Sequence, residues 1–134
     1  MKNICFYFQL HEPVRLKRYR FFEISQDHYY YDDLQTDERI DKLVQQSYLQ
    51  ANKTIAEMIR SSNGKFRCSF VISGVMLELF EQYSPEIIDS FKELAKTGSV
   101  DFIAEPYAHS LASIFNAAEF EKQVNLHSEK LQHL

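Results

Sequence analysis

Residues that could do chemistry gather in two short segments of this sequence. The first segment directly follows an apolar run at residues 4–10, and the second surrounds residue 107. The candidate site residues are His11, Glu12, Glu105, Tyr107 and His109. Imidazoles and carboxylates can hydrogen-bond the hydroxyl groups of a sugar ring, and tyrosines offer apolar surface beside them. These residue types therefore indicate a pocket for a carbohydrate or another polar metabolite, although His11 and Glu105 also fit the role of plain polar residues at strand ends.

Three apolar runs are predicted to be the strands that position these side chains, at residues 3–10, 66–72 and 100–104. Helical spacing of apolar residues predicts a long helix that begins at Thr36 and ends near residue 63, a short helix over 75–83 and a last helix over 117–134. Between them, Ser84 is predicted to cap a helix with Pro85 at its first position. The order β-α-β-α-α-β-α indicates an α/β fold with parallel strands and crossover helices.

The carboxyl ends of parallel strands are where ligands bind in such folds. Strand alternation places the more polar side chains of each strand on one face. These are Cys5, Tyr7, Gln9 and His11; Arg67, Ser69, Val71 and Ser73; and Asp101, Ile103 and Glu105. We expect His11, Ser73, Asp101 and Glu105 to converge, with Glu12, Tyr107 and His109 just outside them.

Composition limits the classes of protein that this chain can belong to. Its 134 residues are 45% hydrophobic and 25% charged, which fits one globular domain over residues 1–134. A formal net charge of −4 argues against partners such as nucleic acid or a membrane surface. The run at 4–10 is too short to span a membrane and lacks a signal-peptide cleavage site, so we expect a cytoplasmic chain. No cysteine pair has metal-ligand spacing, and no metal or cofactor is expected.

Three other features have a structural reading that competes with a functional one. His127 lies on an apolar helical face, where a packed core histidine is expected more often than a ligand. Basic residues between positions 15 and 20 precede several acidic ones, which is typical of a solvated face. Tyr29, Tyr30 and Tyr31 could form a sugar platform or a subunit contact, but packing against their own domain is the expected role.

Three segments together resemble glycoside hydrolase family 57, the α-amylase-like enzymes built on an incomplete (β/α)7 barrel. FYFQLHEPVR at residues 6–15 is similar to the family's first motif, with a His-x-Pro after the first strand. LAKTGSVDFIAEPYAHSLASIF at 94–115 resembles the second motif region, and FEKQVNLHSEKL at 120–131 resembles the helix before the third motif. The family usually has Gln between the His and Pro of its first motif, whereas this chain has Glu12.

The resemblance implies the N-terminal portion of a retaining enzyme that acts on an α-glucan or maltooligosaccharide. It implies a partial (β/α) barrel, with a Glu nucleophile and an Asp acid/base in motifs beyond Leu134. Retention needs two carboxyl groups about 5 to 5.5 Å apart. No residue of this chain is therefore expected to be catalytic, and the five candidate residues are expected to bind the sugar.

Two alternatives remain open at the level of the sequence. A metal-dependent carbohydrate deacetylase or mannosidase would need three or four converging zinc ligands and a His-x-Asp motif in the first segment. A non-enzymatic α/β domain would self-associate through its sheet edges and bind no saccharide. In the incomplete barrel as well, the unpaired edge of the third strand favours a homo-oligomer.

Overall fold

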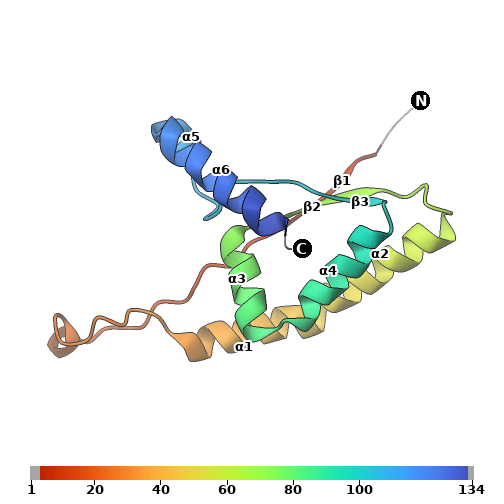
Figure 1. Ribbon diagram of the computed structural model, residues 1–134. Coiled ribbons are helices and arrows are strands. Elements are labelled where there is room, and N and C mark those ends of the chain that lie inside the picture. Colours follow the sequence, from red (N-terminus) through yellow and green to blue (C-terminus); the bar gives the residue numbers. More distant parts are fainter. Residues whose placement is uncertain (1–3, 133–134) are drawn as a thin grey trace.

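The computed structural model describes residues 4–132 and is built around a three-stranded parallel sheet (Figure 1). The strands lie side by side in chain order as β1 (Phe6–Leu10), β2 (Cys68–Ile72) and β3 (Val100–Phe102). Gln9 lies opposite Val71 in the register of the first pair. The predicted parallel sheet is confirmed, but the third strand ends at Phe102 instead of residue 104.

Helices connect the strands, as the α/β pattern predicted. They are α1 (Asp33–Leu43), the π-helical turn η2 (Val44–Tyr48), α2 (Leu49–Ser61), α3 (Gly74–Tyr83), α4 (Glu86–Lys96), α5 (Ala112–Phe115) and α6 (Ala117–Leu131). The short α5 was not predicted, and residues 133–134 of the predicted last helix lie outside the described part. Within residues 4–132, no helix combines the length and the hydropathy needed to cross a membrane.

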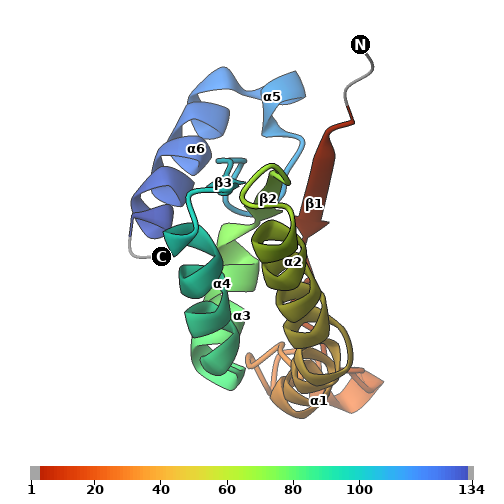
Figure 2. The same cartoon turned by 90° about the vertical axis from the view of Figure 1, so that its right-hand side faces the viewer.

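The core lies between one face of the sheet and the helices α2 and α4 packed below it (Figures 1 and 2). Phe70 is at its centre, with its ring 5.1 Å from Phe8 and 5.4 Å from Phe91 between centroids. Burial of each such side chain stabilises the fold by about 1.5 to 3 kcal/mol. Tyr7 and Gln9 point to the other face and are exposed, so that face is open for a site.

Two predicted helix starts are wrong, for different physical reasons. The long helix begins at Asp33 because Asp32 accepts a hydrogen bond from the backbone N–H of Gln35, whereas Thr36 lies inside the helix. For α4 the N-cap is Pro85 instead of Ser84. The buried Ser84 hydroxyl has no hydrogen-bond partner within residues 4–132, so it does not cap the helix.

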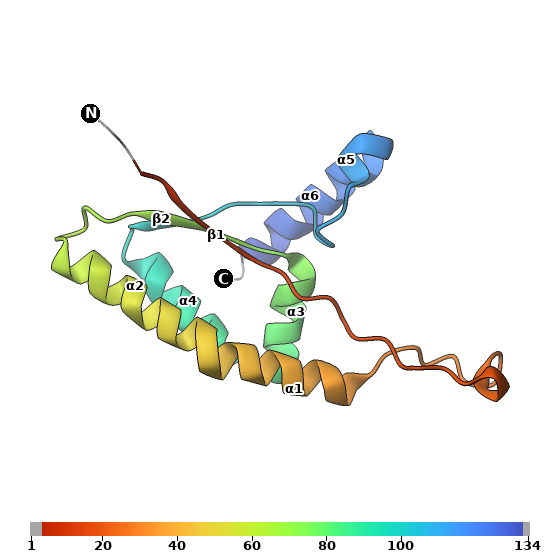
Figure 3. The ribbon, with the colours of Figure 1, turned by 180° about the vertical axis from the view of Figure 1, so that it is seen from behind.

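Residues 13–32 form an arm that extends away from the sheet and helices (Figure 3). Two backbone hydrogen bonds join the outgoing and returning segments of the arm near its base. The Asp32 N–H donates to the Arg15 carbonyl, and the Lys17 N–H donates to the Tyr30 carbonyl. A one-turn 3-10 helix, η1 (Phe21–Glu23), lies at the far end. The three consecutive tyrosines of the arm are about half-exposed, and Tyr29 hydrogen-bonds Asp33 at the start of α1, so the expected packing against the body is only partial.

Candidate functional site

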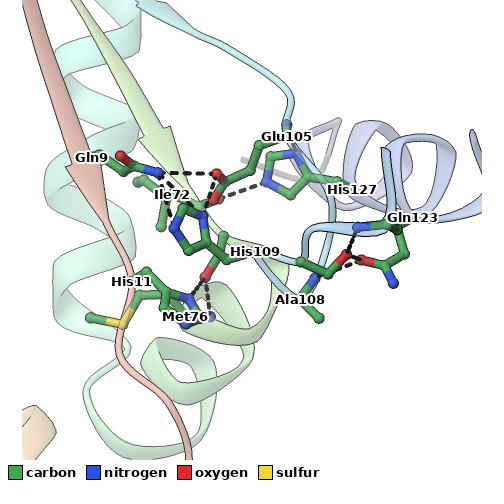
Figure 4. Close-up of polar contacts among 12 residues, drawn as sticks. Gln9, His11, Ile72, Met76, Glu105, Ala108, His109, Gln123 and His127 are labelled. Atoms are coloured by element: carbon green, nitrogen blue, oxygen red, sulfur yellow. Dashed lines mark hydrogen bonds and ion pairs between the residues drawn. The ribbon is translucent and has the colours of Figure 1, made fainter. Parts of the chain in front are cut away.

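Five polar residues meet where the parallel strands end (Figure 4). We call them the strand-end cluster: Gln9, His11, Ser73, Glu105 and His109. Gln9 belongs to β1 and His11 follows that strand directly. Ser73 follows β2, and the other two residues lie in the loop after β3. Parallel strands bring these three chain segments to one edge of the sheet, as predicted for His11, Ser73 and Glu105.

Ser73 holds the imidazole of His11 in place through a short hydrogen bond. The Ser73 hydroxyl oxygen accepts the backbone N–H of Met76 as the N-cap of α3, and lies 2.8 Å from His11 Nδ1. Because a serine hydroxyl has one hydrogen and two lone pairs, Ser73 can donate to Nδ1 or accept from it, depending on the tautomer of His11. Burial, followed by the charge of His109, lowers the pKa of His11 below its ordinary value of 6.5. At neutral pH His11 is thus an uncharged hydrogen-bond donor.

His109 is held against Glu105 by a tight turn of the backbone. Its Nδ1 lies 2.8 Å from Glu105 Oε2, and its ring lies 4.7 Å from that of His11. The φ angle of His109 is +53°, a left-handed conformation that costs a non-glycine residue about 1 kcal/mol or more. The turn is closed by the His109 N–H donating to the Pro106 carbonyl at 2.8 Å. One of the strained backbone positions of the chain thus lies in the candidate site.

The carboxylate of Glu105 is only partly satisfied by the protein. Oε2 accepts from His109 and, at 3.4 Å, from Gln9 Nε2. Oε1 is buried and has no hydrogen-bond partner within residues 4–132, and the side chain is 11% exposed. An unpaired buried carboxylate oxygen costs free energy, so this atom calls for a donor from a ligand or from another part of a larger protein.

His127 holds the Glu105 backbone in place from α6. The Glu105 N–H donates to His127 Nδ1 at 3.0 Å, so the His127 hydrogen is on Nε2 and donates to the Ile72 carbonyl at 2.6 Å. The side chain is fully buried, as predicted for a core histidine. Sequence reasoning missed that it joins two strand ends. The one feature of the sequence that could have indicated this role is the position of a histidine on an apolar helical face.

Glu12 and Tyr107 lie apart from the strand-end cluster. Glu12 Oε1 forms ion pairs with Arg15 and, at 3.4 Å, with Arg39 of α1. The Tyr107 hydroxyl donates to Glu78 Oε1 at 2.6 Å, and burial followed by this hydrogen bond raises the pKa of Tyr107. Of the five predicted site residues, the structure therefore brings together His11, Glu105 and His109.

Asp101 does not converge with the cluster, contrary to the expectation. It lies opposite Ser69 in the sheet and is exposed, 3.9 Å from Arg67. Glu105 follows it by four positions, which is about 13 Å along an extended chain at 3.3 Å per residue. The alternation of side chains correctly predicts the sheet face on which a residue lies. It does not predict how far along the strand the residue lies from the carboxyl end.

Within residues 4–132, no three His, Cys, Asp or Glu side chains are arranged to hold a metal ion. The chemistry available to the cluster is hydrogen bonding. His11 offers a neutral N–H, Glu105 an acceptor oxygen, and Gln9 an amide that can do both.

Three comparisons with known proteins give consistent results. The model of glycosyl hydrolase family 57 matches residues 5–134. A protein of Methanocaldococcus jannaschii described as "Putative alpha-amylase" is 34% identical over 130 residues, which is 92% of this chain and 27% of that protein. The crystal structure of 4-alpha-glucanotransferase from Thermococcus litoralis shares the fold at a TM-score of 0.59 and 14% identity, over 96% of this chain and 16% of its own. The chain thus spans about a quarter of its curated relative, and it belongs to glycosyl hydrolase family 57.

Proposed function

We propose that the chain is the N-terminal part of a retaining glycoside hydrolase or glucanotransferase, in which the strand-end cluster binds an α-glucan. Family membership supports the reaction class, and the names of the two relatives support α-glucan as the substrate class. The three βα units then form the start of a (β/α)7-type barrel. Its interior would be the sheet face that carries Tyr7 and Gln9 and that α2 and α4 leave open.

The buried, unpartnered Oε1 of Glu105 carries this proposal. A sugar hydroxyl at the cluster can accept from the exposed Gln9 amide or from the N–H of a neutral imidazole, and can donate to the Glu105 carboxylate once the ligand or the side chain shifts to expose it. Neutral polyols satisfy both demands without bringing a charge into a half-buried site. The rigid support from Ser73 and His127 means that little side-chain freedom would be lost on binding.

The cluster supports binding of the substrate, not cleavage. It contains a single carboxylate, whereas a retaining glycosidase needs two. Glu12 is engaged by two arginines, and Asp101 lies near the start of its strand. In the proposal, Glu12 and Tyr107 shape the walls around the sugar, and the nucleophile and acid/base come from outside these 134 residues.

Titration with maltoheptaose tests the proposal. Glu105→Gln should weaken binding at least about tenfold, or about 1.4 kcal/mol, because the amide loses a charged acceptor. Asp101→Asn is the matched control, since it removes an exposed carboxylate from the same sheet face. Isothermal calorimetry on both variants measures the difference. Equal affinities for Glu105→Gln and the unchanged chain would overturn the strand-end site.

The purified chain should not hydrolyse maltoheptaose, because positioning groups without a nucleophile and an acid leave the main barrier in place. Chromatography of the reaction products measures this. Turnover that disappears in Glu105→Gln would move a catalytic carboxylate into this chain and contradict the assignment.

A further inference from the structure

A second hollow lies between the arm and the start of α1, apart from the strand-end cluster. This arm pocket has a volume of about 680 Å³, which is within the range of small-molecule sites. Its lining includes Tyr19, Tyr29, Tyr31, Asp33 and Gln35. In the chain, the arm follows β1 after His11 and Glu12, and it extends from the carboxyl end of that strand (Figure 3).

Two tyrosine rings form a corner of the arm pocket. The centroids of Tyr29 and Tyr31 are 6.0 Å apart and their planes meet at 82°. Tyr31 is 48% exposed. An exposed aromatic ring can pack against the C–H groups of a pyranose, so the corner offers one face for stacking and one edge beside it.

The corner is held rigid by its neighbours. The Tyr29 hydroxyl donates to Asp33 Oδ2 at 2.5 Å, which raises the pKa of Tyr29 to about 12. The Tyr19 hydroxyl donates to the Tyr29 carbonyl at 2.9 Å, and Lys17 Nζ lies 4.8 Å from the centroid of the Tyr29 ring. Fixed aromatic side chains lose little freedom on binding and therefore favour a ligand that stacks on them.

The charges of the arm pocket disfavour an anionic ligand. Two cationic residues, Lys17 and Arg18, line it against four carboxylates. The carboxylates also do not converge as metal ligands within residues 4–132. Asp32, for example, accepts from the Gln35 backbone as the cap of α1. A neutral ligand rich in hydroxyl groups fits such a mixture of acceptors, donors and aromatic surface.

We infer that the arm pocket binds glucose units of an α-glucan chain, as a second contact surface beyond the strand-end cluster. The choice of an α-linked glucan rests on the proposed function, whereas the preference for a neutral saccharide follows from the tyrosine corner and the charges. A single chain long enough to leave the strand ends could contact both surfaces.

Backbone amide shifts in an NMR titration with maltoheptaose test this inference, because they report on the arm and the strand ends separately. Residues 27–35 should shift in the unchanged chain and in Glu105→Gln. Tyr31→Ala should abolish the arm shifts and weaken overall binding about fivefold. Tyr31→Leu should do the same while keeping apolar bulk, which covers a failure of the alanine variant to fold. Circular dichroism checks the fold of each variant.

Tyr30→Ala is the matched control. Tyr30 is 51% exposed and adjacent in sequence, but it does not line the arm pocket. Shifts at the strand ends without shifts at residues 27–35 would overturn the inference and leave the proposed function standing. Arm shifts alone would support the inference and contradict the strand-end site. Equal arm shifts with cellohexaose, a β-linked glucan, would overturn the assignment to α-glucan.

Discussion

His127 connects two strand ends through one imidazole, and its removal should be costly. His127→Ala leaves the Glu105 N–H and the Ile72 carbonyl without partners in a buried place. We expect the free energy of unfolding to fall by about 2 to 4 kcal/mol. Urea denaturation measures it, with His28→Ala on the exposed arm as the control. A loss no larger than that of the control would show that other groups hold the loop.

The lowered pKa of His11 predicts a dependence of stability on pH. Below pH 6.5 the unfolded chain binds a proton at this residue before the folded chain does. As the pH decreases from 6.5 to the lower pKa of the folded state, the free energy of unfolding therefore decreases. Above about pH 7 His11 has no such effect on the free energy of unfolding.

His11→Asn should make this decline shallower, as measured by urea denaturation at several pH values between 5 and about 7.5. His28→Asn is the control, because His28 lies exposed on the arm. If the free energy of unfolding decreases equally with decreasing pH in His11→Asn and in the unchanged chain, the attribution of this pH dependence to His11 is contradicted.

The candidate site was predictable to the extent that strand alternation determines it. Alternation and the strand ends are local properties, and they correctly brought His11 and Glu105 together. The more distant partner of Glu12 was not visible, because Arg39 is 27 residues away on a helix whose packing depends on the whole core. His109 was proposed as a site residue, but its left-handed backbone conformation could not be predicted, because a histidine does not favour that conformation as a glycine does.

Helix α3 starts at a glycine because the Tyr107 ring covers that position. A Cβ atom at Gly74 would overlap the ring. Gly74→Ala should lower the free energy of unfolding by about 1 to 3 kcal/mol through overpacking. In a Tyr107→Ala background the same change should cost nothing, because the space is then open and alanine favours the helix. Chemical denaturation of the two single variants and the double variant measures the coupling. Additive effects would contradict the proposed contact.

The elements themselves were predictable where apolar periodicity is long. All three strands and the helices between them arise from such runs. Periodicity could not show the π-helical turn at Val44–Tyr48, because the spacing of four between the buried residues Thr36, Ile40 and Val44 that leads into it also fits an ordinary α-helix. The four-residue helix α5 has no buried side chain and hence no apolar signal. The prediction of Ser84 as a cap was wrong because its hydroxyl is buried without a partner within residues 4–132. A sequence pattern does not reveal this burial.

At the scale of the molecule, β1 and β3 are both edge strands, each paired on one side within the described residues. Exposed apolar side chains lie nearby on and before α5, namely Leu111, Ile114 and Phe115. Unpaired edges and apolar patches favour association. We therefore expect a homo-oligomer whose contact buries more than about 1,000 Å².

Light scattering after size exclusion measures the mass. Phe115→Ser should shift the distribution toward monomer, and Phe22→Ser at the far end of the arm is the control. A monomeric mass at high concentration, with a cooperative thermal transition, would contradict this expectation.

The base of the arm has a consequence for how the family could diversify. Main-chain hydrogen bonds between Arg15 and Asp32 and between Lys17 and Tyr30 close it, so its closure does not depend on the side chains beyond. Insertions and substitutions between these points can accumulate with little effect on the sheet, because lengthening an exposed loop costs little free energy. The length and composition of the arm are thus uncoupled from the stability of the sheet and its helices.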